Sequence, residues 1–247
     1  MSDIFIERPL LPVNDVTVCA VSEEACDTIK CLEERGIRVL RVRRAGNLPD
    51  AICSHADLQV LPLGGSLVAV NEQQTDLIAQ LEEIGFRVMK TGGFGKEYPH
   101  DCVLNLLPLK SFLIGKRSVM PRQILSLGIF EPVDVAQGYS RCSSVLLDED
   151  AVLTDDPSIG KTVLNFAKFS IMLKQKEIVL KGYDHGFIGG SCGKISEKEV
   201  AFCGRIPDTP FGRALKEALA ERGFSFCELG SSQLTDTGGI VPLMQRG

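Results

Sequence analysis

The sequence has no long apolar run, no basic block and no metal-finger motif. Its apolar stretches fall short of the roughly 18–20 residues that cross a bilayer, so we expect no membrane span. Residues 1–9 show neither the charged start nor the apolar core of a signal peptide, and we expect a cytoplasmic protein. The net charge of −5, without a cluster of Lys and Arg, argues against a nucleic-acid partner.

The nine cysteines show no spacing typical of disulfides or zinc fingers. Their number is odd, and no Cys-x-x-Cys or His-x-x-x-His pair occurs. Free cysteine is a small and mostly buried residue, so most of these should be core residues in a reducing compartment. Residues 160–162 end like a phosphate-binding loop, but Asp155 stands where that loop needs its first glycine. No motif predicts a cofactor, and we expect none.

One phrase recurs along the chain. Residues 32–39 read LEERGIRV, residues 81–88 LEEIGFRV and residues 219–226 LAERGFSF, with a weaker copy, LSLGIF, at 125–130. Each copy has the end of a helix, a glycine that can take the left-handed capping conformation, and the start of a strand. The copies lie about 45 residues apart, with a last gap about twice as long. The chain therefore predicts about five similar units, and its 44% apolar content is ample for a core.

The second unit shows the order of elements most clearly. Two short apolar segments, 58–63 and 66–70, flank the Gly64-Gly65 turn and predict a hairpin. Residues 72–84 place apolar side chains on one helical face, and 86–90 predict a strand. The unit is therefore strand, strand, helix, strand.

The other units repeat this order, which predicts an α/β fold in a single domain, residues 1–247. The first unit has no first strand of its own, and the strand 240–244 is left over at the other end, so we expect that strand to pair beside 16–21. The expected units are approximately 12–50 plus 234–247, 51–97, 98–138, 139–183 and 184–233. The expected first strands of the last three units are 102–107, 142–147 and 187–194, and the fourth unit should end in a strand at 177–180.

This series of units resembles the pentein, or guanidine-modifying enzyme, superfold. Its members include arginine deiminases, dimethylarginine dimethylaminohydrolases, agmatine deiminases and amidinotransferases, and also the non-enzymatic ribosome anti-association factor. The resemblance implies a five-fold pseudosymmetric α/β propeller of ββαβ units, closed by the C-terminal strand joining the N-terminal unit. It also implies a central pore to which each unit contributes one or two site residues.

In the catalytic members of this superfold, a cysteine near the C-terminus attacks the guanidinium carbon and a fourth-unit histidine moves protons. Carboxylates from the early units hold the cationic substrate, because they match its donor geometry. By their place in units two and three, these carboxylates fall on Asp57 and Asp101, which would otherwise be turn-capping or solvated side chains. Asp236 and Thr237 in the C-terminal segment are further candidate substrate-binding residues.

The chain departs from the family's pattern at both catalytic positions. Val241 or Pro242 stands where the cysteine is expected, and there is no histidine near Tyr139, where the fourth-unit histidine would fall. The usual covalent mechanism cannot operate with these residues.

A displaced site is one alternative. Cys142 or Cys192 could supply the thiol and His100 the base, since a thiolate needs a neighbouring positive charge or base. Together with Cys102 and His185, these groups could also form a ring of metal ligands. The other reading is that the cysteines are small core residues of strands.

Three functions remain open. The one we favour is a pore site for a guanidino or other cationic amino compound, in a binding protein or in an enzyme with C–N hydrolase or amidinotransferase-like activity. The second is a non-enzymatic interaction protein with a protein partner or a homodimer, and the third is a metal-binding or redox-sensitive cysteine protein. We expect the glycine-rich loop 92–95 to cover the mouth of the pore.

Overall fold

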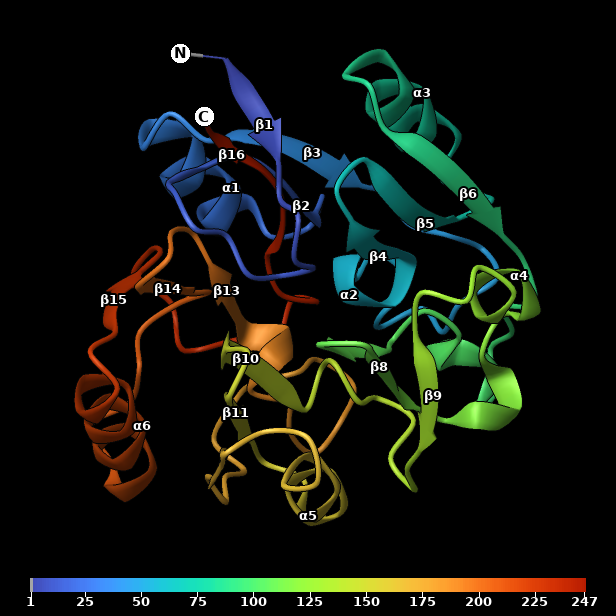
Figure 1. Cartoon of the computed structure of the whole chain (residues 1–247). Coiled ribbons are helices and arrows are strands. Elements are labelled where there is room, and N and C mark those ends of the chain that lie inside the picture. Colours follow the sequence, from blue (N-terminus) through green and yellow to red (C-terminus); the bar gives the residue numbers. More distant parts are fainter. Residues whose placement is uncertain (1) are drawn as a thin grey trace.

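The computed structural model describes residues 2–247, and its strands form five small sheets around the middle of the molecule (Figure 1). The largest sheet has the order β1 (Asp3–Phe5), β16 (Val241–Arg246), β2 (Val16–Ser22) and β3 (Arg38–Val42). The other four sheets have three strands each. Two of them consist of β4 (Val60–Gly64), β5 (Leu67–Asn71) and β6 (Arg87–Thr91), and of β7 (Leu107–Leu109), β8 (Phe112–Gly115) and β9 (Glu131–Asp134). The other two consist of β10 (Ser144–Asp148), β11 (Ala151–Thr154) and β12 (Phe169–Met172), and of β13 (Cys192–Lys194), β14 (Glu199–Phe202) and β15 (Ser225–Glu228).

The longer helices lie outside the sheets, and α2 lies near the middle (Figure 1). The α-helices are α1 (Cys26–Glu34), α2 (Ala56–Gln59), α3 (Thr75–Glu83), α4 (Arg122–Leu125), α5 (Pro157–Val163) and α6 (Pro210–Glu221). Three 3-10 turns are η1 (His100–Cys102), η2 (Arg117–Val119) and η3 (Gly189–Ser191). No helix in the described part of the chain is both long and apolar enough to cross a membrane.

All four three-stranded sheets have the same connectivity. The first two strands pair antiparallel as a hairpin, and the third returns through a helical segment to lie parallel to the second. In the largest sheet β16 takes the place of the first strand, because it pairs antiparallel with β2, with Val241 opposite Ala20. The pairing of the C-terminal strand expected from the sequence is therefore present.

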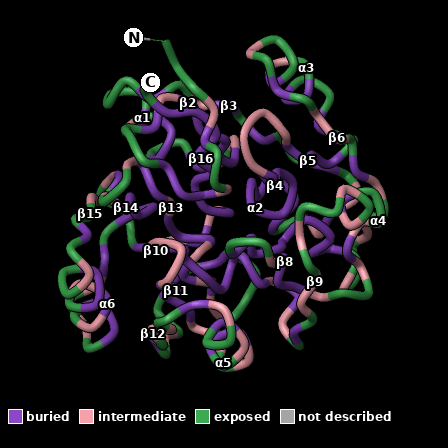
Figure 2. The backbone as a smooth tube through the Cα atoms, viewed as in Figure 1, coloured by how far each residue is buried: buried purple, intermediate pink, exposed green. Residues whose placement is uncertain are grey.

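The repeated phrase forms the elements it predicts. In α3, Leu77, Ile78 and Leu81 are buried on one face, as their helical spacing requires. Gly85 follows with φ +97, a conformation that side chains with a Cβ rarely adopt, and turns the chain into β6. Figure 2 shows the result, with buried strands toward the middle and exposed helical faces outside.

One apolar cluster joins several sheets at the centre. Val18, Val60, Leu107, Leu146 and Val241 are all buried in it, and they come from four different sheets. The sheets are therefore held together by shared core contacts, and the turns that lead into the first strands are brought close to one another.

The first strands begin later than the sequence predicts. Short helical turns stand at the expected strand starts, so that Asp57 lies in α2, Cys102 in η1 and Cys142 in a turn before β10. The reason is that a short continuous apolar run is compatible with a strand or with a buried helical turn, and periodicity alone does not separate them.

The strand predicted at 177–180 is wrong. The last strand of that sheet is β12, and 177–180 forms a loop in which Val179 makes a single bridge to Thr235. The Gln175 Oε1 accepts the backbone N–H groups of Glu177 and Ile178, which removes them from any ladder. The sequence also gave no sign of β1, a short and mostly exposed strand beside β16.

Candidate functional site

A buried thiol and a buried carboxyl meet where α2 and the turn before β10 come together. The Cys142 Sγ donates to Asp57 Oδ2 at 2.6 Å, and both residues are almost fully buried. Asn105 holds this pair in place, because its Nδ2 donates to Cys142 Sγ at 3.0 Å and to the Asp57 carbonyl at 3.2 Å. Its Oδ1 accepts the backbone N–H groups of Arg141 and Cys142. One amide thus links three turns.

The C-terminal segment brings a second carboxyl to the same place. Asp57 N donates to the Gly238 carbonyl at 3.0 Å, which packs the segment against α2. The Asp236 carboxyl accepts the backbone N–H groups of Phe187 at 2.9 Å and of Gly238 at 3.1 Å. A Cβ on Gly190 would overlap the Asp236 carboxyl, so glycine is needed for this approach.

The electrostatics of these groups follow from burial. Burial raises the pKa of Asp57, with Asp236 adding to the effect and His55 and Arg141 opposing it. Burial also raises the pKa of Asp236 to about 6 and lowers that of His55, whose Nδ1 lies 3.7 Å from Asp236 Oδ1. The pKa of the Cys142 thiol is well above its usual range, through burial and then the charge of Asp57. A cation placed here would offset the cost of ionising the carboxyls.

These groups adjoin a cavity of about 250 Å³. Its lining residues are Ile52, His55, Leu58, Tyr139, Cys142, Leu180, Tyr183, Asp184, His185, Phe187 and Asp236. A second cavity of about 590 Å³ adjoins it and shares His55, Leu180 and Asp236. The first cavity is mainly apolar and aromatic, whereas the second also has the charged side chains of Glu24, Arg44 and Lys181.

The structure places three of the residues predicted from the sequence together. Cys142 and Asp236 line the first cavity, and Asp57 stands behind Cys142. Thr237 lines the adjoining cavity. Asp101 is connected indirectly, because its carboxyl accepts the hydrogen bond of the Tyr139 hydroxyl.

Of the other predicted residues, His185 lines this cavity, whereas His100, Cys192 and Cys102 lie apart from it. His100 is exposed, with Nδ1 3.4 Å from the Gly93 carbonyl, and Cys192 donates to the Ile188 carbonyl at 3.2 Å. Cys102 donates to the Pro99 carbonyl at 3.0 Å. Across residues 2–247 no three His, Cys, Asp or Glu side chains are grouped as metal ligands.

The cover of the cavity differs from the prediction. The loop 180–187 supplies Leu180, Tyr183, His185 and Phe187 to its wall, whereas none of the lining residues comes from the glycine-rich loop 92–95. The sequence also did not indicate Asn105. This residue lies in the segment 102–107, which is predicted as a strand, and nothing in a strand pattern marks an asparagine as part of a site. Its role depends on contacts with residues 37 and 48 positions away.

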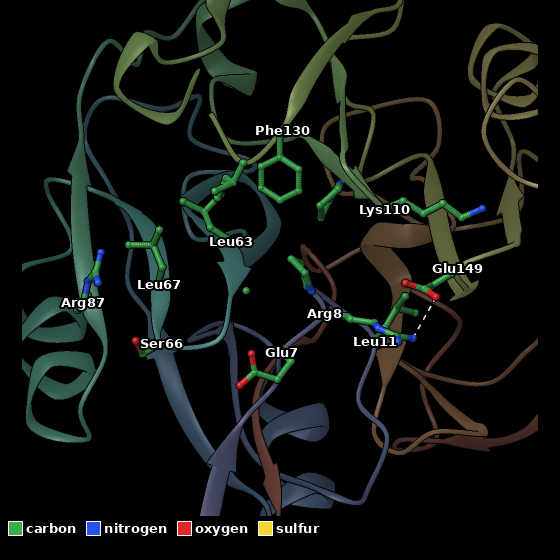
Figure 3. A pocket seen from close by; sticks show the side chains of 14 residues that line it. Glu7, Arg8, Leu11, Leu63, Ser66, Leu67, Arg87, Lys110, Phe130 and Glu149 are labelled. Atoms are coloured by element: carbon green, nitrogen blue, oxygen red, sulfur yellow. Dashed lines mark ion pairs between the residues drawn. The ribbon is translucent and has the colours of Figure 1, made fainter. Parts of the chain in front are cut away.

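A separate groove of about 470 Å³ lies elsewhere, between the N-terminal segment and the strands β4 and β7 (Figure 3). Arg8 and Glu149 form an ion pair of 3.0 Å at one side of it, and Leu63 and Phe130 form an apolar side. It contains no cysteine or histidine, and its charged groups are exposed. The cavity at Cys142, which is lined by a cysteine, two histidines and a buried carboxyl, is therefore a better candidate for the functional site than this groove.

Comparisons with known proteins agree with the fold. A family model described as "Family of unknown function (DUF6873)" matches residues 20–241. No curated protein sequence matches the chain.

Among solved structures, the chain is similar to SxtG, an amidinotransferase of saxitoxin biosynthesis from Microseira wollei, with 10% identity, 97% of each chain covered and a TM-score of 0.60. It is similar to the inosamine-phosphate amidinotransferase StrB1 from Streptomyces griseus, with 11% identity, 97% and 98% covered and a TM-score of 0.60. It is also similar to the DDAH from Pseudomonas aeruginosa, with 12% identity, 95% and 100% covered and a TM-score of 0.56. The chain has the pentein fold that these enzymes share.

Proposed function

The chain belongs to the DUF6873 family, and we propose that it binds a small cationic amino compound, guanidino or other, in the cavity beside Cys142 and Asp236. The observation that carries this proposal is a pair of buried carboxyls, Asp57 and Asp236, without a lysine or arginine within ion-pair distance in the described structure, although the Arg141 charge acts on the pKa of Asp57. In the described structure the only basic group within ion-pair distance of either is His55, beside Asp236, and burial favours its neutral form. A cationic ligand would supply the missing charge.

Two further polar atoms support a ligand at this place. Asp57 Oδ1 and His185 Nδ1 are buried without a hydrogen-bond partner. Native proteins rarely leave buried polar atoms unpaired, because each loses its contacts with water without compensation. Groups of this kind near a cavity favour a bound molecule that completes them.

The names of the similar structures favour a guanidino compound or a related one. Two are amidinotransferases, and the DDAH structure is a complex with citrulline. At identities of 10–12% this similarity concerns the fold, so the ligand class rests mainly on the carboxyls of this chain.

The geometry favours binding over covalent catalysis. The Cys142 thiol is protonated at neutral pH, since its pKa is raised and its S–H group is directed to Asp57. No imidazole in the described chain is hydrogen-bonded to its Sγ, whereas an activated thiol needs such a base or a nearby positive charge. We therefore propose a binding protein in which the usual Cys and His pair is missing.

We further propose that the five sheets form a five-fold pseudosymmetric propeller in one domain. The common connectivity of the sheets and the pairing of β16 with β2 support this arrangement. In it, the turns before the first strands converge on a central pore, and Asp57, Cys142 and Asp236 belong to three such turns.

A thermal-shift screen tests the proposed function. The purified protein is screened against arginine, agmatine, methylated arginines, creatine and choline, with zinc as a separate arm. A ligand at about 100 times its dissociation constant adds roughly 2.7 kcal/mol of stability. We expect at least one cationic amino compound to raise the Tm, and Asp236→Asn to abolish the shift.

The matched control is Asp208→Asn, because the Asp208 side chain is 92% exposed and outside both cavities. This variant should keep the shift. If no cation raises the Tm, the proposal is contradicted, and a function of the outer surface, where the groove of Figure 3 lies, is favoured instead. A shift with zinc alone would instead support a metal-binding cysteine protein.

A further inference from the structure

All three tyrosines of the chain gather at one cavity. Tyr139 and Tyr183 line it, and the ring of Tyr98 lies 6.2 Å from the ring of Tyr139. Phe187 joins them, with its ring stacked on Tyr139 at 5.9 Å. The chain has no tryptophan, and the group contains all three of its tyrosines and one of its twelve phenylalanines.

The rings of Tyr139 and Tyr98 are held in place by their neighbours. The Tyr139 hydroxyl donates to the buried Asp101, and the Tyr98 hydroxyl donates to the Ala136 carbonyl at 3.0 Å. A Cβ on Gly138 would lie 2.6 Å from the Tyr98 ring, so glycine allows that ring to approach. Little order has to be imposed on these rings when a ligand binds.

Most of the rest of the wall is apolar, and its acceptors are confined to the carboxyls of Asp184 and Asp236 and the imidazoles of His55 and His185. Ile52, Leu58 and Leu180 are apolar, and the carboxyl of Asp236 already accepts two backbone N–H groups. A guanidinium or a primary ammonium carries several N–H donors, and each one that is desolvated without an acceptor weakens binding. An alkylated ammonium has one such donor or none, and its charge is spread over methyl groups.

Aromatic faces suit that kind of cation. A cation over a ring face is attracted by the ring quadrupole, and cages of aromatic rings recognise quaternary ammonium groups. The nearby carboxyls of Asp184 and Asp236 supply the negative charge that a neutral apolar ligand would not need.

We propose that the cavity binds a tertiary or quaternary alkylammonium group in preference to a primary ammonium or a guanidinium. This inference rests on the proposed function and names the ligand class of the same site. The ring faces of Tyr139, Tyr183 and Phe187 hold the alkyl groups, and the carboxyl of Asp236 balances the charge.

Matched ligands test the preference by isothermal titration calorimetry. Choline is compared with ethanolamine, and trimethyl-lysine with lysine, so that each pair differs in methylation alone. The neutral isostere 3,3-dimethylbutanol reports the contribution of charge. We expect each methylated member to bind at least about tenfold more tightly than its partner, and choline more tightly than the neutral isostere.

The outcomes separate the two proposals. Equal affinities, or tighter binding of ethanolamine and lysine, would overturn the alkylammonium preference and leave the cationic site intact. Binding of the neutral isostere as tightly as choline would overturn the role of charge. Absence of binding by every cation, agmatine and arginine included, would overturn both proposals.

Variants of one exposed ring give a second readout. The side chain of Tyr183 is partly exposed, so Tyr183→Leu should fold with an unchanged Tm. It should weaken binding of choline at least about tenfold, whereas Tyr183→Phe, which keeps the ring, should bind normally. Unchanged affinity in Tyr183→Leu would contradict the aromatic contact.

Discussion

The Sγ of Cys142 lies 2.6 Å from Oδ2 of Asp57, and the two residues are 85 positions apart in the sequence. The contact joins the turn before β10 to α2, and both groups are buried. A thiol that donates to a buried carboxyl stays protonated, so this contact places a protonated, unreactive thiol between the carboxyl of Asp57 and the cavity that Asp236 lines. Five predictions about this site can be tested.

Cys142 should react with an alkylating reagent more slowly than an exposed thiol of the chain. Burial and the charge of Asp57 both raise its pKa, and the thiolate is the reactive form. At pH 7.5 with limiting iodoacetamide, we expect its modification to lag about tenfold or more behind that of the exposed Cys26. Peptide mass spectrometry measures both sites in one sample. A Cys142 that reacts faster than Cys26 would indicate an activated nucleophile and favour the enzyme alternative.

Asn105→Ala should destabilise the fold. The substitution leaves the backbone N–H groups of Arg141 and Cys142 buried without their acceptor. We expect a loss of about 2–4 kcal/mol in the free energy of unfolding, measured by urea titration. The control Asn165→Ala removes an exposed amide that binds only the nearby Thr162 carbonyl and should change stability by less than about 0.5 kcal/mol. Equal effects of the two variants would contradict the account of Asn105.

Binding of a permanently charged cation should increase with pH. The pKa of Asp236 is raised by burial from 3.8 to about 6, so its carboxyl is largely neutral at pH 5 and ionised at pH 7. Choline titrated by calorimetry between these values should gain affinity by roughly tenfold or less, and Asp236→Asn should remove the dependence. Affinity that is flat with pH in the native chain would show that Asp236 does not face the ligand.

The raised pKa of Asp236 also makes stability depend on pH, but in the opposite direction to binding: the free energy of unfolding should fall as the pH rises. A carboxyl whose pKa is raised on folding contributes stability below its unfolded value, and that contribution is lost as the pH rises through about 6. For Asp236 we expect the loss to be on the order of 3 kcal/mol at most, and Asp155, with a pKa raised to about 7, should add to it. The lowered pKa of His55 acts in the other direction, since its contribution is lost as the pH falls.

Urea titrations at several pH values, from about 4 to 7.5, measure this dependence. Asp236→Asn should flatten the curve, whereas Asp208→Asn, at an exposed position, should leave it unchanged. A curve that is the same in the native chain and in Asp236→Asn would contradict the burial of this carboxyl.

Gly190→Ala should damage the site more than the fold around it. The added Cβ would overlap the Asp236 carboxyl, which then has to move. We expect a destabilisation of about 1–3 kcal/mol and loss of cation binding, measured by urea titration and calorimetry. Gly46→Ala is the control, because its Cβ would meet only the Gln73 side chain at 3.8 Å. Retained binding in Gly190→Ala would show that the carboxyl position is unimportant.

The sequence predicts elements well where a strong local pattern dominates. The predicted strands at 66–70 and 86–90 match β5 (Leu67–Asn71) and β6 (Arg87–Thr91) to within one residue, because short apolar runs there are bounded by turns. The pattern fails at 177–180, where Gln175 captures two backbone donors, a contact that periodicity does not reveal. Local pattern therefore predicts most helices and strands, whereas the late starts of the first strands and the contacts between sheets depend on tertiary packing.

The site could be predicted only in part. Asp57 and Asp101 are predicted from equivalent positions of the repeated units, Cys142 from its place at the start of a unit, and Asp236 as a further candidate in the C-terminal segment; of these, Asp101 reaches the cavity only through Tyr139. Asn105 and the group of tyrosines could not be predicted, because their roles depend on contacts between segments far apart in the sequence. No local pattern marks a residue whose partners are set by tertiary packing.

The central claim is that the cavity beside Asp236 binds a cationic amino compound. Isothermal titration of agmatine and choline into the native chain, Asp236→Asn and Asp208→Asn tests it most directly. The account predicts saturable binding of at least one compound at one site per chain, weakened about tenfold or more by Asp236→Asn and unchanged by Asp208→Asn. Absence of binding by both compounds, or equal binding by all three proteins, would contradict it.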